Sequence, residues 1–393
     1  MLPKPNTNFT LPSLYDDLEL DCRLYFPRVK TVSHEENHVG GCAIFAHPYA
    51  PLGGCYDDPV VHSVGSVLLR HGFVLATFNF RGAEKSAGRT SWSGKAELGD
   101  YVSVYAFMLA FINEGGVVDN ILNADDNATS NLLPTLLLGG YSYGSMIAAH
   151  LPDIGVVLRI LQHAKVGSAE HEIKNRAHEL AQAFLGYCEV QQQRGRSNLK
   201  SLPAEVLQTS GATFGGYESP TAAHRISREG SRRSIDPERV RQSVDRVRRK
   251  LGSRSYSTGA HSSASAEATT PPEVVPKLMI LLVSPLQGPV SSFATVFTKL
   301  KFERRDPKAT AARDAPVMDT DVMLSSNHSL IVFGTDDRFT SPRKVSNWCQ
   351  SLKARPGSMM DFREIVRAGH FWHDPGLESQ MTGAVAEWLK SVH

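Results

Sequence analysis

Residues 134–151 read PTLLLGGYSYGSMIAAHL, and the fold class is predicted outward from this segment. Its first part is a short apolar run, typical of a strand buried on both faces, and its last part is an apolar helical segment. Between them, Gly140-Tyr141-Ser142-Tyr143-Gly144 fits the pattern G-x-S-x-G. This pattern predicts a sharp turn from strand to helix that lifts the serine hydroxyl clear of the sheet. Glycine is expected on either side because side chains two residues before and after the serine would collide.

The alternation of apolar runs and helical patterns continues on both sides of this turn. Strands are expected over 17–26, 41–46, 73–80, 134–138, 278–283, 329–333 and 362–366. Helices are expected over 60–71, 98–112, 145–151, 342–352 and 377–392. Strands that alternate with helices predict an α/β fold with a mostly parallel central sheet and helices on both faces. The strand over 17–26 alternates apolar and polar residues, which places it at an antiparallel edge.

A long insertion interrupts this rhythm. We expect one discontinuous α/β domain formed by residues 1–152 and 276–393. Residues 153–214 are interpreted as a helical insertion and candidate lid, with a helix over 169–193. Residues 215–275 form a low-complexity segment rich in Ser and Arg. Such a segment cannot bury enough apolar area to offset the entropy of ordering, so we expect it to be disordered.

The charges are unevenly spread along the 393 residues. The chain has 42 Lys and Arg against 40 Asp and Glu, a net charge of +2. Residues 225–254 alone contain eleven Lys or Arg and four Asp or Glu, so the rest of the chain carries −5. No aromatic residues are interleaved in this basic segment. The pattern therefore favours a solvated segment or a protein partner over a specific nucleic-acid site.

The cysteines and the apolar runs bear on the compartment. Five widely spaced cysteines without a C-x-x-C pair argue against a disulfide framework and against a zinc site. The first residues lack the layout of a secretory signal, and no apolar run is long enough to cross a membrane. We therefore predict a cytoplasmic protein without a transmembrane segment. No metal cluster and no phosphate-binding loop stands out, so no cofactor is expected.

The serine turn predicts nucleophilic chemistry. In this context Ser142 is the candidate nucleophile, and the backbone N–H of Tyr143 is a candidate oxyanion donor. The second donor should come from the loop after the strand over 41–46. Pro48 has no N–H to offer, so the N–H of Tyr49 is the candidate.

A nucleophilic serine needs a base and an orienting carboxylate, and where the serine lies on such a strand–helix turn they follow it along the chain in the order acid, then His. Asp336 and Asp337 both follow the strand over 329–333, and the residues alone leave either as the acid. His370 follows the last strand and is the candidate base, with His373 as the fallback. Arg81 ends another strand. It is interpreted either as a ligand for an anionic substrate group or, preferably, as part of an ion pair that braces the next turn.

Several short motifs occur around these candidates, each weak by itself. They are His47-Pro48, Gly53-Gly54, Asp57, Val60-Val61-His62, Phe78-Asn79-Phe80-Arg81-Gly82, Ser86, Gly88, the serine turn, Ser284-Pro285 and Ala368-Gly369-His370-Phe371-Trp372-His373. Together they resemble a family of small α/β hydrolases related to the dienelactone hydrolases. The resemblance covers most of 41–150 and 276–393, and nothing between.

This resemblance implies an α/β hydrolase fold and a Ser-Asp-His triad. The family's acid lies three residues after the strand-end glycine, which selects Asp337 over Asp336. The chain departs from the family at Tyr49-Ala50, where the family has a second His-Pro, and at Glu84, where it has Gly. Because both positions lie near the expected mouth of the site, the substrate does not carry over.

The expected function is that of a serine hydrolase acting on a small-molecule acyl substrate. It would cleave a carboxylic ester or thioester through an acyl-enzyme, with acyl transfer as a variant. The alternative is a catalytically inactive scaffold that presents the basic segment to protein partners. The complete chain order of Ser142, Asp337 and His370 favours the enzyme.

Overall fold

The strand that leads into the serine turn lies inside an eight-stranded sheet. The computed structural model describes residues 1–28, 40–91, 93–122, 133–200, 274–286 and 319–392, all within one unit spanning Met1–Leu202 and Glu273–His393. In chain order the strands are β1 (Thr7–Pro12), β2 (Glu19–Tyr25), β3 (Gly41–Ala46), β4 (Phe73–Phe78), β5 (Thr135–Tyr141), β6 (Lys277–Val283), β7 (His328–Gly334) and β8 (Met360–Ile365).

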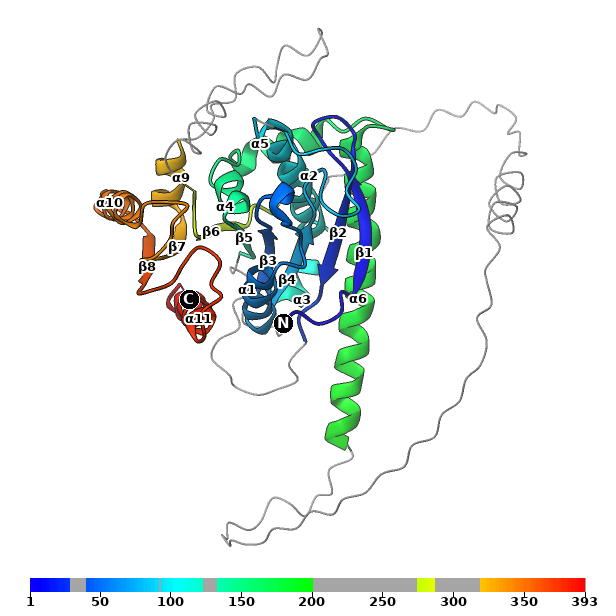
Figure 1. Cartoon of the computed structure of the whole chain (residues 1–393). Coiled ribbons are helices and arrows are strands. Elements are labelled where there is room, and N and C mark those ends of the chain that lie inside the picture. Colours follow the sequence, from blue (N-terminus) through cyan, green and yellow to red (C-terminus); the bar gives the residue numbers. More distant parts are fainter. Residues whose placement is uncertain (29–39, 92, 123–132, 201–273, 287–318, 393) are drawn as a thin grey trace, which may run out of the picture. The chain divides into compact units, whose positions relative to one another are not determined.

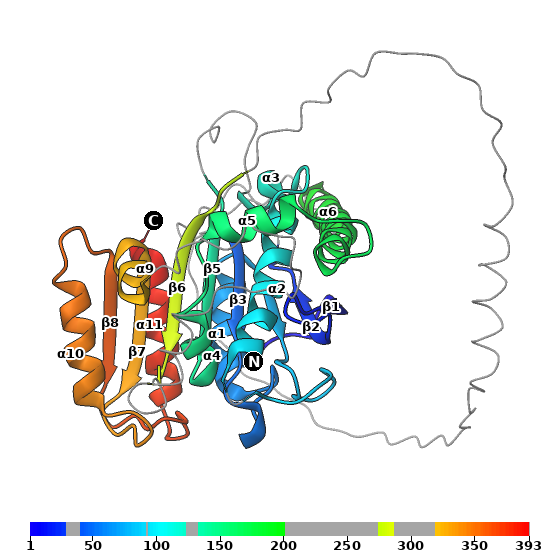
Figure 2. The same cartoon turned by 90° about the horizontal axis from the view of Figure 1, so that it is seen from above.

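The strands lie side by side in the order β1-β2-β4-β3-β5-β6-β7-β8 (Figure 2). β1 and β2 are antiparallel to their neighbours, and β4, β3, β5, β6, β7 and β8 are mutually parallel. Every residue of β3, β4 and β5 is buried, which is why these strands read as continuous apolar runs.

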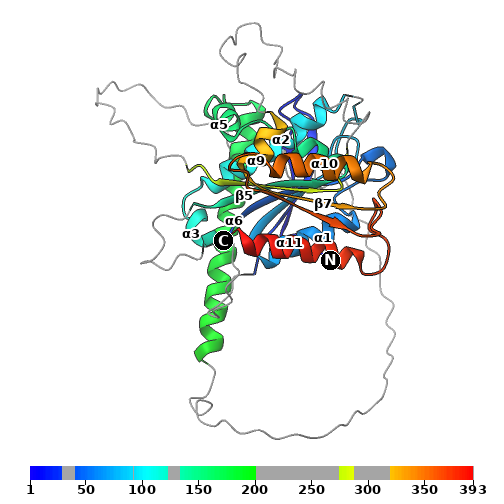
Figure 3. The same ribbon diagram turned by 90° about the vertical axis from the view of Figure 1, so that its left-hand side faces the viewer.

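The helices cover both faces of the sheet (Figure 3). In chain order they are η1 (Ala50–Leu52), α1 (Pro59–Arg70), α2 (Lys95–Ile112), α3 (Val117–Leu122), α4 (Tyr143–Ala148), α5 (Ile154–Gln162), α6 (Ala169–Lys200), α9 (Thr320–Ser326), α10 (Pro342–Lys353) and α11 (Leu377–Ser391). α1 and α11 pack on one face, and α2, α4, α9 and α10 pack on the other. The described core therefore has two apolar layers separated by the sheet.

This strand order, with a parallel centre, two antiparallel strands at one end and helices on both faces, is the α/β hydrolase fold. The predicted fold class is confirmed. The carboxyl ends of the parallel strands share one edge of the sheet, where the loops after β3, β5, β7 and β8 meet. The candidate site residues belong to these loops.

The antiparallel edge differs from the expectation in one respect. The strand expected over 17–26 is β2, but β1 lies outside it and forms the edge. β1 and the helices α3 and α5 are not predicted from the sequence. No element is predicted between the strands over 278–283 and 329–333, whereas residues 320–326 form α9, which is capped by Asp319 and buries Met323 and Leu324.

The helical part of the predicted insertion packs on the sheet domain. α6 lies along β1 and α2 (Figure 1), and its main contacts are with α2, α3, α5 and β1. The ring of Phe184 packs against those of Phe26 and Phe111, with centroids 5.1 and 5.8 Å away. These contacts lie at the antiparallel end of the sheet, and a lid role for this segment stays a prediction. Disorder is predicted over 215–275. Residues 215–273 of this segment, which include the basic segment 225–254, lie outside the described residues.

Candidate active site

The serine turn has strained backbone geometry. Ser142 joins β5 to α4 with φ 54° and ψ −114°, a conformation that a residue with a side chain seldom adopts. Its N–H donates to the carbonyl of Val283 at 2.9 Å, which fixes the turn to the end of β6. Strain of this kind costs about 1–3 kcal/mol and persists only where the surrounding structure imposes it.

Two glycines make the turn sterically possible. A Cβ on Gly140 would lie 2.4 Å from the carbonyl carbon of Gly144. A Cβ on Gly144 would lie 2.6 Å from the carbonyl oxygens of Ala46 and His47 in the loop after β3. Both distances are far below van der Waals contact and involve backbone atoms. Glycine is therefore required at both positions, and the close approach brings the β3 loop beside the serine.

The structure brings Ser142, His370 and Asp337 together, although they are far apart in the sequence. Ser142 Oγ lies 2.8 Å from His370 Nε2, and Asp337 Oδ2 lies 2.7 Å from His370 Nδ1. All three residues are buried. With the proton on Nδ1, the imidazole donates to the carboxylate and accepts the serine O–H. This arrangement is the one that activates a serine as a nucleophile.

The neighbouring aspartates have different surroundings. Asp337 Oδ1 accepts the N–H groups of Phe339 at 2.8 Å and Thr340 at 3.1 Å, so this carboxylate is held from both sides. Asp336 is exposed, and its side chain contacts the hydroxyl of Thr335 at 3.1 Å. Of the two aspartates, Asp337 is the one that is hydrogen-bonded to the imidazole of His370. His373, the fallback base, is exposed and stacks on Phe371, with centroids 5.6 Å apart.

Three residues that the sequence analysis gave no role hold the His370 loop. Tyr141 donates its O–H to the carbonyl of His370 at 2.9 Å. Trp372 Nε1 donates to Ser284 Oγ at 3.1 Å, which ties the loop to the end of β6. A Cβ on Gly334 would lie 2.0 Å from the carbonyl oxygen of Ala368, so glycine is needed for the loop to approach β7. Nothing in the local sequence around Tyr141, Trp372 and Gly334 predicts these contacts, apart from the motifs that resemble those of the dienelactone-hydrolase-related family.

The candidate oxyanion donors lie on two segments that touch. Tyr143 is the first residue of α4, where backbone N–H groups lack partners within the helix. The Tyr49 ring packs on the Tyr143 ring, with centroids 5.2 Å apart. The Tyr49 carbonyl accepts the N–H groups of Leu52 and Gly54, which folds its loop into a tight turn. Donation from the Tyr49 and Tyr143 N–H groups to an oxyanion stays a prediction.

His47 connects the loop after β3 to the loop after β4. Its Nε2 lies 2.9 Å from the N–H of Phe80, so Nε2 accepts this hydrogen bond and Nδ1 carries the proton. Nδ1 then donates to the carbonyl of Pro48 at 2.6 Å. Burial lowers the pKa of His47 to about 4, so the ring is neutral near pH 7. In the sequence this residue stands out only as part of the His47-Pro48 motif, whereas in the structure its contacts fix the backbone just before Tyr49.

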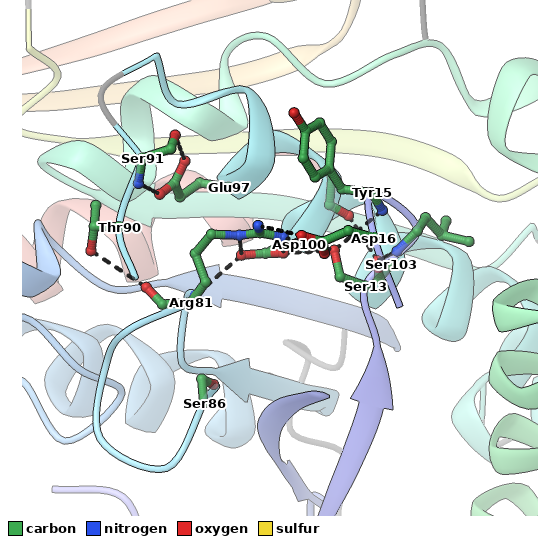
Figure 4. A network of polar contacts seen from close by, with 12 residues as sticks. Ser13, Tyr15, Asp16, Arg81, Ser86, Thr90, Ser91, Glu97, Asp100 and Ser103 are labelled. Atoms are coloured by element: carbon green, nitrogen blue, oxygen red, sulfur yellow. Dashed lines mark hydrogen bonds and ion pairs between the residues drawn. The ribbon is translucent and has the colours of Figure 1, made fainter. Parts of the chain in front are cut away.

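A second buried polar cluster surrounds Arg81 (Figure 4). The Arg81 guanidinium donates to both carboxylate oxygens of Asp100, at 2.7 and 2.9 Å, and to Asp16 at 2.9 and 3.0 Å. Ser13 also donates to Asp100, at 2.7 Å. With two carboxylates facing one guanidinium, the cluster is net negative and would repel an anion. The structure thus supports the ion-pair interpretation of Arg81.

The departure from the family at Glu84 has a backbone consequence. Glu84 is exposed and has φ 46°, a left-handed conformation that glycine adopts more easily. The turn is closed by the N–H of Ala83, which donates to Phe80, and by the N–H of Ser86, which donates to Ala83. Glu84 therefore adopts, in this turn, the left-handed backbone conformation that favours glycine.

The described residues contain no group of three or more His, Cys, Asp or Glu side chains placed to hold a metal ion. Among the same residues, no helix is both long enough and apolar enough to span a membrane.

No family model matches the chain, and no curated protein matches it significantly in sequence. The chain is similar to an α/β serine hydrolase without a lid from Xanthomonas campestris: 13% identity, 100% of this chain and 97% of that chain covered, and a TM-score of 0.45. An α/β serine hydrolase homologue from Coxiella burnetii is 13% identical over 98% of this chain and 99% of that chain, with a TM-score of 0.43. An esterase from Pyrococcus furiosus is 10% identical over 98% and 89%, with a TM-score of 0.44. The assignment of the fold stands on the strand order itself.

Proposed function

We propose that this protein is a serine hydrolase that cleaves a carboxylic ester or thioester through an acyl-enzyme. The observation that carries the proposal is the strained Ser142 at the strand–helix turn, with its Oγ 2.8 Å from His370 Nε2. Buried Asp337, itself held by two backbone N–H groups, supports the role of orienting carboxylate. Strain, burial and a directed hydrogen-bond chain coincide at one edge of the sheet.

In the first half of the proposed reaction, Ser142 Oγ attacks the acyl carbon while its proton passes to His370 Nε2. The carbonyl oxygen becomes an oxyanion, which the N–H groups of Tyr143 and Tyr49 would stabilise. When the intermediate collapses, the bond from carbon to the leaving oxygen or sulfur breaks. The leaving group takes the proton from His370 Nε2, and the acyl group stays on Ser142.

In the second half, water replaces the leaving group. His370 accepts a proton from the water as its oxygen attacks the acyl carbon, and a second tetrahedral intermediate forms. Collapse breaks the bond to Ser142 Oγ, which recovers its proton from His370. Asp337 keeps the imidazole in one tautomer and stabilises its positive charge in both halves. With a different acceptor in place of water, the same steps transfer the acyl group.

The alternative function, a catalytically inactive scaffold, is not favoured. A scaffold has no need of a strained serine backbone, which costs stability, or of a buried Asp–His pair directed at that serine. The basic segment that such a scaffold would present lies outside the described residues.

Active-site labelling tests the proposal directly. A fluorophosphonate probe should modify the wild-type protein on the peptide that contains Ser142, and Ser142→Ala should abolish the labelling. Ser351→Ala, on the exposed side of α10, is the matched control and should be labelled like the wild type. Labelling that persists in Ser142→Ala, or a wild-type protein that is not labelled at all, would contradict the proposed nucleophile.

A further inference from the structure

Two aromatic side chains stand half-exposed beside the candidate base. Phe339 and Phe371 are each 49% exposed, whereas Trp372, the next residue, is 4% exposed. The rings of Phe339 and Phe371 contact each other edge to face, with centroids 5.3 Å apart and planes at 86°. Single exposed apolar residues are common on protein surfaces, but a contacting pair at a reactive centre calls for a partner.

Both rings rest on the imidazole of His370. The Phe339 ring centroid lies 4.5 Å from that of His370 at an interplanar angle of 32°, and the Phe371 centroid lies 5.4 Å away at 88°. Their positions depend on the same bonds that hold the triad residues. The N–H of Phe339 donates to Asp337 Oδ1, and Phe371 follows His370 directly in the chain. The backbone of both residues is therefore tied to the segments that carry Asp337 and His370.

The chemistry of the imidazole identifies what lies next to these rings. His370 Nε2 must give its proton to the leaving oxygen or sulfur, so that atom has to come within hydrogen-bond distance of Nε2. The rest of the leaving group then extends from this atom along the surface around the imidazole. The acyl group instead remains bonded to Ser142, next to the oxyanion donors. Rings that flank His370 consequently face the leaving group rather than the acyl group.

We propose that Phe339 and Phe371 form the leaving-group subsite and select an ester or thioester whose alcohol or thiol part is apolar and carries a ring. This inference rests on the proposed function and adds the substrate class to it. The edge-to-face pair offers one ring face and one ring edge, and a planar apolar group can pack against both. His373, stacked on Phe371 at an interplanar angle of 14°, extends the row of rings outward.

The test compares leaving groups at a constant acyl group. The kcat/KM values for benzyl acetate and methyl acetate are measured with the wild type and with Phe339→Ala/Phe371→Ala, and the benzyl-to-methyl ratio is reported. Any common disturbance of His370 cancels in this ratio. Each ring is expected to contribute about two- to tenfold to the ratio, as aromatic pairs do beyond burial. The ratio of methyl butyrate to methyl acetate, which varies only the acyl group, should stay as in the wild type.

Three further variants keep the test independent of folding. Phe371→Tyr retains the ring and should retain the ratio, whereas Phe371→Leu should lower it. Met359→Ala removes a comparably exposed apolar side chain just before β8, at the opposite end of the strand from His370, and should leave both ratios unchanged. Fluorophosphonate labelling of Ser142 shows that each variant is folded.

The outcomes separate the two proposals. If the wild type hydrolyses both acetates but the double variant keeps the benzyl-to-methyl ratio, the leaving-group subsite is wrong and the hydrolase stands. If the acyl ratio changes in place of the leaving-group ratio, the rings face the acyl group and the inference is also overturned. If the wild type neither hydrolyses the esters nor is labelled at Ser142, the proposed function fails, and the inference falls with it.

Discussion

Two buried polar clusters in the described part of the molecule, one around Arg81 and one around Ser142, differ in what they leave unsatisfied. Around Arg81, the guanidinium is matched by the carboxylates of Asp100 and Asp16. Around Ser142, the backbone is strained, and the hydroxyl, imidazole and carboxylate form a directed chain that ends at a nucleophilic atom. Burial of charge is common to both. Strain and an open-ended hydrogen-bond chain distinguish the candidate active site from the structural cluster.

Apart from loss of the proposed nucleophile or base, the largest effect is expected at the proposed acid, Asp337. Asp337→Asn should lower kcat by about 10⁴, roughly 5.5 kcal/mol in the activation barrier, because it favours the wrong tautomer of His370. Asp336→Asn, at the exposed neighbour, is the matched control and should cost far less. Steady-state hydrolysis of an activated ester measures both. A larger loss from Asp336→Asn would reverse the assignment of the acid.

The Arg81 cluster should respond in stability. Arg81→Ala leaves the buried carboxylate of Asp100 without its cation, and breaking a buried pair in this way costs about 3–5 kcal/mol. The free energy of unfolding in urea measures the loss, and the folded protein should keep its activity. The control is Arg355→Ala, which breaks a partly exposed ion pair with Asp321 and should cost about 1 kcal/mol or less. Unchanged stability with a lost turnover would make Arg81 a substrate ligand.

His47 should make stability depend on pH below neutrality. Burial holds its pKa at about 4, whereas the unfolded chain binds a proton near pH 6.5. As the pH falls from 6.5 to 4, the unfolded state gains this proton and the folded state does not, so the fold loses up to about 3 kcal/mol.

The measurement is the free energy of unfolding of the wild type and of His47→Gln at pH 7 and pH 4. The wild type should lose about 3 kcal/mol more than the variant across this interval. An equal acid dependence in both proteins would show that His47 is not held neutral by the fold.

The smallest effect concerns the fallback base. His373 is exposed and stacks on Phe371 without a hydrogen bond to Ser142. His373→Ala should therefore lower kcat by less than about tenfold, or about 1.4 kcal/mol. His370→Ala, measured with the same activated ester, should abolish turnover. Similar losses from the two variants would assign His373 a part in proton transfer.

The elements around the serine turn could be predicted from the sequence because their apolar runs and turn glycines are local patterns. β3 was predicted with its observed bounds, Gly41–Ala46, since both its faces are buried and its residues are continuously apolar. The glycines of the turn follow from local sterics. The chain order of acid and base after the serine is likewise a property of the sequence. Local patterns therefore carry much of the candidate site.

Most of the features that could not be predicted from the sequence depend on residues far away in the chain. Arg81 finds Asp16 and Ser13, both 65 or more residues away, and no local pattern joins them. The edge strand β1 is six residues long and owes its place to β2 and α6. α5 does carry a local signal, Asp153 capping the N–H of Gly155 at 2.8 Å, but it falls in the segment interpreted as an insertion.

The central claim is that Ser142 carries the acyl group between two half-reactions. The most direct test is mass spectrometry of the protein quenched during the first turnover of p-nitrophenyl acetate, followed by peptide mapping. One acetyl group is expected on the peptide that contains Ser142, formed at the rate of the p-nitrophenolate burst, and none in Ser142→Ala. An acetyl group on another residue, or steady hydrolysis that persists in Ser142→Ala, would contradict this claim.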